Sequence, residues 1–137
     1  MRFRILFSLL VFLTVCIISI NPASAGIYYV THDAPGGGDG SWGSPWTIVE
    51  GFTNAVAGDT IKVQSGTYTN VHPKVGNSGS SGSRIIFESE GGVVALDGVD
   101  HNGYGIDMNG KSYITINGFT IFDYQIGISG TSVNYNN

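Results

Sequence analysis

The chain of 137 residues is poor in cysteine, which excludes an internal disulfide, and poor in basic residues, which argues against a nucleic-acid partner. Its single cysteine, Cys16, has no second cysteine to pair with, so no disulfide within the chain can stabilise the fold. Six lysines and arginines stand against ten aspartates and glutamates, and the formal net charge of −4 argues against a nucleic-acid partner. The 21 glycines all follow residue 25 and predict a chain of short strands and turns. The length allows one small domain.

The first 25 residues have the layout of a secretory signal peptide. Arg2 and Arg4 precede an apolar run over residues 5–20, and the Ala-Ser-Ala sequence at residues 23–25 provides the small residues of a cleavage site. The apolar run is shorter than the roughly 20 residues that cross a bilayer. We therefore expect cleavage before Gly26, and a mature protein that is secreted or periplasmic and not attached to a membrane.

Residues 26–58 are predicted to form a strand, a loop and a capping helix. Residues 26–31 are rich in β-branched and aromatic side chains, which favour a strand. The stretch at residues 33–43 is rich in glycine and is expected to be a loop. Its Asp33 and Asp39 have the ligand chemistry for calcium, but aspartates among glycines more often form turns, and we assign no metal to them.

The helix is expected to begin at Ser44-Pro45 and to end at Gly58. Serine can cap free amides at a helix start, and proline fits the first helical position. Gly51 should weaken this helix because glycine loses more backbone entropy than other residues. The apolar residues that share one face at helical spacing are Val49, Phe52 and Val56. Such a helix would cover the first open end of a stack of strands.

From residue 59 onward the sequence consists of short strand-like segments separated by glycine. The segments cover residues 61–66, 85–92, 93–98, 104–110, 113–119 and 124–130. Nothing between them is long and periodic enough to form a helix, which excludes a sheet with helical crossovers. A sandwich, a barrel or a solenoid is left.

A repeated spacing favours the solenoid among these architectures. Identical or similar residues recur 20 positions apart: Tyr104, Ile106, Met108 and Gly110 as Tyr124, Ile126, Ile128 and Gly130, and Leu96-Asp97-Gly98 as Ile116-Asn117-Gly118. Equivalent residues of successive coils stack about 4.8 Å apart, so a constant spacing is expected in a solenoid. A second register stays open, in which residues 93–98 pair with residues 118–123 and residues 85–87 lie under residues 114–116.

The order of these segments resembles the opening of the pectate-lyase-like parallel β-helix superfamily, in secreted bacterial proteins. The most specific parts are GDTIKVQSGTY at residues 58–68 and SYITINGFTI at residues 112–121. The resemblance implies an all-β fold, a right-handed parallel β-helix with a short N-terminal capping helix. Residues 59–137 would form its first coils, incomplete at the C-terminal end, where an open edge would permit self-association.

The resemblance also implies a carbohydrate-related function. Enzymes of this superfamily commonly cleave acidic polysaccharide by β-elimination, with a lysine or arginine as base and Ca²⁺ held by carboxylates. We expect the N-terminal fragment of a polysaccharide-lyase-like protein. The alternatives are a non-enzymatic glycan-binding or cell-surface solenoid and an inactive truncated product. Family sites usually lie on later coils, so no catalytic, cofactor or metal residue is assigned, and Ca²⁺ rests on the resemblance alone.

Several polar and aromatic residues are candidate site residues, and each has a plainer interpretation. Lys111 with Asp107 and Asp123 would supply a base and calcium ligands, but a turn lysine and outward aspartates are typical of solvated surface. Lys74 and His72 are expected in a polar loop. Three tyrosines could offer stacking faces for sugar rings or form part of the solenoid flank: Tyr104, Tyr113 and Tyr124. His32 and His101 lack the spacing of metal ligands.

Overall fold

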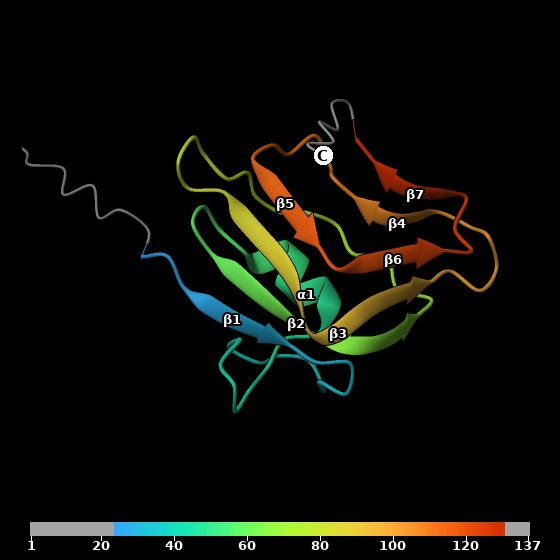
Figure 1. Ribbon diagram of the computed structural model, residues 1–137, viewed down its shortest axis with the longest axis horizontal. Coiled ribbons are helices and arrows are strands. Elements are labelled where there is room, and N and C mark those ends of the chain that lie inside the picture. Colours follow the sequence, from blue (N-terminus) through green and yellow to red (C-terminus); the bar gives the residue numbers. More distant parts are fainter. Residues whose placement is uncertain (1–23, 131–137) are drawn as a thin grey trace, which may run out of the picture.

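The structure is a computed structural model that describes residues 24–130 (Figure 1). Its elements are β1 (Ile27–Val30), α1 (Ile48–Asn54), β2 (Thr60–Thr69), β3 (Ile85–Asp97), β4 (Tyr104–Asp107), β5 (Ile114–Asn117), β6 (Phe119–Phe122) and β7 (Ile126–Ser129). The fold is therefore mostly strand with one short N-terminal helix, as predicted. The predicted signal peptide falls largely on residues 1–23, which lie outside the described residues.

The named strands pair in parallel and form two sheets that do not close. The larger sheet has the order β1-β2-β3-β5, and β6 also pairs with β3. The first half of β3 lies beside β5 and its second half beside β6, as Figure 1 shows. Strands β4 and β7 form the smaller sheet, which an isolated parallel bridge between Lys74 and Asp107 extends. Each later segment of the chain thus returns beside an earlier one.

Strands β2 and β3 bend together at positions occupied by glycine. The register between them shifts from Gln64 to Gly66, the irregularity of a β-bulge. Gly66 has φ 147°, and Gly91 and Gly92, in the irregular stretch of β3 between the partners of Gln64 and Gly66, have φ 83° and 151°. Residues with a Cβ atom rarely adopt such positive φ angles, so glycine is needed at this bend of the two strands. Gly118, with φ 76°, separates β5 from β6 on the next strand level.

The register between strands decides between the two alternatives left by the sequence. Val94 pairs with Phe119, and Ile85 pairs with Ile114, so the second register is confirmed. The 20-residue spacing is wrong as a register, since Tyr104 lies beside Ile126 and not beside Tyr124. Between β4 and β7 the difference is two residues, which leaves every side chain on the same face of its strand, so the hydrophobic alternation is satisfied by both spacings there. In β3 the difference is five residues, since Leu96 pairs with Ile121 and not with Ile116.

The same register removes the predicted pairing of Asp97 with Asn117. Asp97 lies beside Phe122, and Asn117 lies beside Glu88. No side-chain ladder can therefore join the two polar residues. Asp97 instead accepts a hydrogen bond from the backbone N–H of Val99 at 3.0 Å, which forms a local turn after β3.

The helix begins later and ends earlier than the sequence predicted. Thr47, and not Ser44, is the N-cap: its side chain accepts from the Glu50 N–H, while the Glu50 carboxylate accepts from the Thr47 N–H at 2.8 Å. This reciprocal capping box satisfies two amides at the helix start. The predicted apolar face is also wrong in part, since Phe52 is buried but Val49 and Val56 are 44% and 38% exposed.

The inner face of the helix packs its aromatic side chain into the core. The Phe52 ring stacks on Phe87 with centroids 3.9 Å apart, and it meets Phe119 edge-on at 6.2 Å. Gly51 lies against β1, where an added Cβ would stand 2.5 Å from Cγ2 of Val30. Gly51 therefore permits a close approach, in contrast to the weak point that its helix propensity suggests.

The outer edge of β1 is covered by the loop that follows it. The Tyr29 N–H donates to the Gly40 carbonyl at 2.8 Å, and the Tyr29 carbonyl accepts from the Trp46 N–H at 2.9 Å. The Thr31 N–H donates to the Trp46 carbonyl at 3.1 Å. These bonds satisfy backbone groups that an edge strand would otherwise leave open. The loop, more than the helix, covers this edge, and it carries a side chain of the site described next.

Candidate functional site

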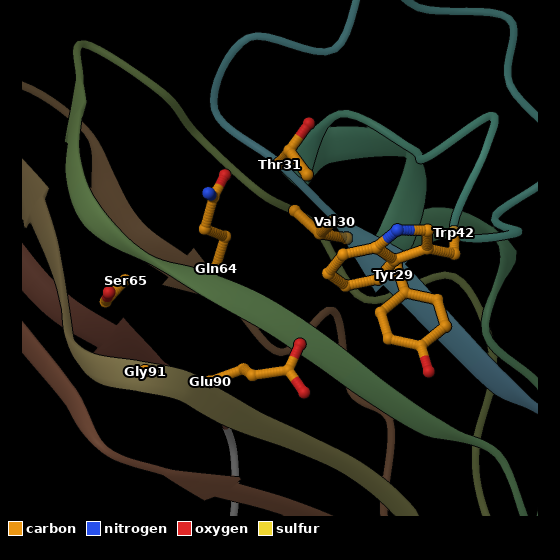
Figure 2. A pocket seen from close by; sticks show the side chains of 8 residues that line it. All are labelled: Tyr29, Val30, Thr31, Trp42, Gln64, Ser65, Glu90 and Gly91. Atoms are coloured by element: carbon orange, nitrogen blue, oxygen red, sulfur yellow. The ribbon is translucent and has the colours of Figure 1, made fainter.

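A groove lies on the outer face of the large sheet, where β1, β2 and β3 run side by side (Figure 2). Its volume is about 320 Å³, at the lower end of the range for small-ligand sites. The lining residues are Tyr29, Val30, Thr31, Trp42, Gln64, Ser65, Glu90 and Gly91. They come from three strands and from the loop that covers β1.

Trp42 is the most exposed large apolar side chain of the groove. Its indole is 75% exposed and meets the Tyr29 ring edge-on, with centroids 5.0 Å apart and an angle of 88° between the planes. An aromatic pair of this geometry is favourable and holds the indole in place. Most of the indole surface still faces solvent, and it forms an apolar platform at one side of the groove.

The loop that carries Trp42 is anchored on both sides. On one side, the Asp39 carboxylate accepts from the Ser41 N–H at 2.9 Å, and hydrogen bonds from Ser41 lower the pKa of Asp39. On the other side, the Trp46 indole N–H donates to the Gly38 carbonyl at 3.0 Å. Asp39, a candidate calcium ligand by its sequence, is thus a turn former in the loop that carries Trp42.

The helix start also contributes to this anchoring. The Glu50 carboxylate accepts from the Gly37 N–H at 2.6 Å as well as from Thr47. These hydrogen bonds, with that from Gly37 the strongest cause, lower the pKa of Glu50 and keep it ionised. One side chain therefore ties the glycine-rich loop to the capping box of α1.

The polar part of the groove lies where β2 and β3 approach their bend. Gln64 and Glu90 are register partners, and Ser65 follows at the bulge. In Figure 2 the carboxylate of Glu90 extends from β3 toward the side of Tyr29. The groove thus combines an apolar platform with an amide, a hydroxyl and a carboxylate.

The charge of the groove is negative. Lys62 lies on the same outer face but pairs with Glu88, and this hydrogen bond is the main cause that raises the pKa of Lys62. None of the ion pairs within residues 24–130 involves Glu90. Its carboxylate is available to accept hydrogen bonds from a ligand, and no basic side chain lines the groove.

The residues weighed as a base and its calcium ligands are not assembled into one group. Asp107 lies 3.7 Å from the Lys74 ammonium and accepts from the Ser129 hydroxyl at 3.1 Å. Asp123 lies 3.6 Å from the His101 ring. Among the described residues, Lys111 forms no ion pair with either aspartate.

The tyrosines and His72 occupy a different part of the molecule from the groove. Tyr124 donates its hydroxyl to the Val71 carbonyl at 2.6 Å, and burial raises the pKa of this phenol. A ring nitrogen of His72 lies 3.1 Å from the Tyr104 carbonyl, and the imidazole meets Tyr124 edge-on at 5.6 Å. Tyr104 and Tyr113 remain exposed outside the groove. These residues thus form flank contacts, while the aromatic platform is Trp42, which the sequence reading missed.

Metal and membrane features can be stated for the described part of the chain. Across residues 24–130, no group of three or more histidine, cysteine, aspartate or glutamate side chains is placed to hold a metal ion. His32 and Asp33 contact each other at 3.2 Å. The only helix in this range is too short to cross a membrane.

Comparison of the chain with family models, with curated protein sequences and with solved structures finds no match. The groove and its chemistry are therefore the basis for a proposed function. Trp42 carried one signal in the sequence: a large aromatic residue between serine and glycine in a polar loop, where burial is improbable.

Proposed function

We propose that the chain belongs to a secreted right-handed parallel β-helix protein that binds polysaccharide through the groove at Trp42. The observation that carries this proposal is the exposed indole beside Gln64, Ser65 and Glu90. The apolar face of a sugar ring stacks on an aromatic platform, and its hydroxyls hydrogen-bond to amide, hydroxyl and carboxylate groups. Each of these partners is present at one site.

The solenoid part of the proposal is supported by the repeated parallel returns of the chain. Glycines with positive φ recur where neighbouring strands bend. Gly66 lies at the bend of β2, residues 91–92 lie at the bend of β3, and Gly118 lies between β5 and β6, which pair with β3. The smaller β4-β7 sheet would supply a third side of each coil. The crossover connection between two parallel strands of one sheet is right-handed in nearly all proteins, which supports a right-handed β-helix.

The negative charge of the groove favours binding of uncharged polysaccharide over binding of acidic polysaccharide. Glu90 would repel a uronate carboxylate, and a β-elimination mechanism needs positive charge next to that carboxylate. A lyase for acidic polysaccharide, the function that the family resemblance implies, is the second proposal. The observation in its favour is the Lys74 ammonium beside Asp107, which pairs a basic group with a carboxylate outside the groove.

The experiment is retention of the purified protein by immobilised polysaccharides, with neutral β-glucans, xylan and mannan compared with pectate, alginate and chondroitin sulfate. Trp42→Ala should abolish retention on neutral polymers, while Tyr104→Ala, which removes an exposed aromatic outside the groove, should leave it unchanged. Glu90→Gln should improve binding of the acidic polymers by removing repulsion. Retention that survives Trp42→Ala, or its absence for every polymer, would overturn the binding proposal.

The same preparations separate the second proposal from the first. A lyase releases unsaturated uronides, which absorb in the ultraviolet, from the acidic polymers. Release that is lost in Lys74→Met and retained in Trp42→Ala would favour the lyase. Retention on neutral polymers without any release would favour the binding protein.

A further inference from the structure

Asp59 is the only charged side chain that is buried among residues 24–130, with 1% of its surface exposed. Its two carboxylate oxygens each accept one backbone hydrogen bond, from the Val56 N–H at 2.9 Å and from the Gly26 N–H at 3.0 Å. None of the ion pairs in this range involves it. Buried carboxylates are ordinarily paired with a positive charge because desolvation is costly. This one has two amide donors and no cation.

The atom bonded to Asp59 stands at the predicted processing site. The Ala-Ser-Ala sequence at residues 23–25 predicts cleavage of the bond that joins Ala25 to Gly26. The nitrogen of that bond is the one that donates to Asp59. Hydrolysis adds the hydroxyl of a water molecule to the Ala25 carbonyl and a hydrogen to the Gly26 nitrogen. At neutral pH the products are a carboxylate on the leader and an ammonium group on Gly26.

The position of Gly26 is determined by contacts on its other side. Its carbonyl accepts from the Thr60 N–H at 2.9 Å, at the start of the β1-β2 pairing. A Cβ at residue 26 would stand 2.5 Å from the Tyr28 ring, so the site accepts glycine. Asp59 is held in turn by its own N–H, which donates to the Val56 carbonyl at 3.0 Å. Both partners are fixed, and cleavage would not require the nitrogen to move.

We propose that Asp59 is a buried binding site for the ammonium group of the processed N-terminus, and that removal of the leader creates an ion pair that fixes β1. An amide donor is replaced by a charged donor at the same nitrogen, and charge-assisted hydrogen bonds are about twice as strong as neutral ones. The carboxylate is already desolvated, so the added counter-charge stabilises the folded chain. The precursor lacks this contribution and gains it only on processing.

This inference rests on the predicted cleavage and is independent of the proposed groove function. Strand β1 carries Tyr29, which supports Trp42, so the ion pair would also steady one wall of the groove. Trp42→Ala, which tests the groove, should leave the effect of processing unchanged. Failure of either proposal is therefore distinguishable from failure of the other.

The test compares two forms of the protein that differ at the N-terminus: one begins at Gly26, and the other retains Ser24-Ala25. The form with Gly26 at its N-terminus should unfold at a higher urea concentration. The difference should vanish in Asp59→Asn, whose side-chain oxygen can still accept one of the two hydrogen bonds but carries no charge. Equal midpoints in the wild-type pair, or a difference that persists in Asp59→Asn, would overturn the proposal.

A second measurement protects the test if Asp59→Asn does not fold. In the wild-type form that begins at Gly26, NMR titration of the ammonium group should give a pKa above the ordinary α-amino value of about 7.7–8.0, because the adjacent carboxylate favours the charged form. A value in the ordinary range would refute the ion pair. N-terminal sequencing that places the secreted protein's first residue elsewhere than Gly26 would refute its link to processing.

Discussion

Replacement of Gly51 by alanine distinguishes helix propensity from tertiary packing, because the two predict opposite signs. Gly51 lies inside α1, where alanine is favoured over glycine by about 1 kcal/mol on propensity alone. In the folded chain, however, the new methyl group would stand 2.5 Å from Val30 Cγ2 and 3.5 Å from Ile61 Cγ2. The first distance is well inside van der Waals contact, so one of the partners must move.

The magnitude follows from how little the neighbours can yield. Val30 is buried, lies in β1 and is β-branched, so its χ1 angle has little freedom. Overpacking of such a core typically costs about 1–3 kcal/mol. With the propensity gain of about 1 kcal/mol subtracted, we expect Gly51→Ala to lower the free energy of unfolding by up to about 2 kcal/mol.

The assay is urea denaturation of four proteins that form a double-mutant cycle: wild type, Gly51→Ala, Val30→Ala and the double variant. Val30→Ala removes the clashing methyl groups and is itself destabilising. In that background Gly51→Ala should stabilise, since only the propensity gain is left. A stabilising effect of Gly51→Ala in the wild type would refute the close packing of α1 against β1.

Three further predictions concern other parts of the chain. N-terminal sequencing of the secreted protein should begin at Gly26, and retention of Arg2 would contradict the predicted cleavage. Light scattering over a concentration series should show self-association that Ile128→Lys reduces, because β7 has a paired strand on one side only among residues 24–130; a monomer at all concentrations would contradict this. Burial raises the pKa of Tyr68 to about 12, so stability should fall as pH rises from about 10, the unfolded value, toward 12. Tyr68→Phe should lose that part of the pH dependence, and an unchanged profile would argue against it.

Much of the strand arrangement was predictable because the determinants are local. The strand at residues 27–30 falls within the predicted segment, and the glycine-separated segments after residue 59 correspond to β2, β3, β4, β5 and β7, with two predicted segments joined in β3. Strand β6 lies mostly between two predicted segments. Alternation of apolar residues and positive-φ glycines act within a few residues of chain. These signals suffice to predict parallel all-β structure with one early helix.

The helix bounds show where local rules compete. Ser44-Pro45 and Thr47 with Glu50 are both acceptable helix starts by cap chemistry. The choice falls to Thr47 because Trp46 pairs with β1: its N–H donates to the Tyr29 carbonyl and its carbonyl accepts from the Thr31 N–H, so the helix cannot include it. That pairing joins residues far apart in the sequence, so no local pattern could indicate it.

The sequence alone determined the class of structure and the expected export, since composition, alternation and the leader are read along the chain. Tertiary structure decided the register, because between β4 and β7 a two-residue shift preserves the face of every side chain and alternation alone does not distinguish the two spacings. It also assembled the groove, whose Trp42, Gln64 and Glu90 come from separate segments. It brought the Asp59 carboxylate within hydrogen-bond distance of the Gly26 nitrogen. Sites of this kind depend on which segments become neighbours, and only the packing of the whole chain specifies that.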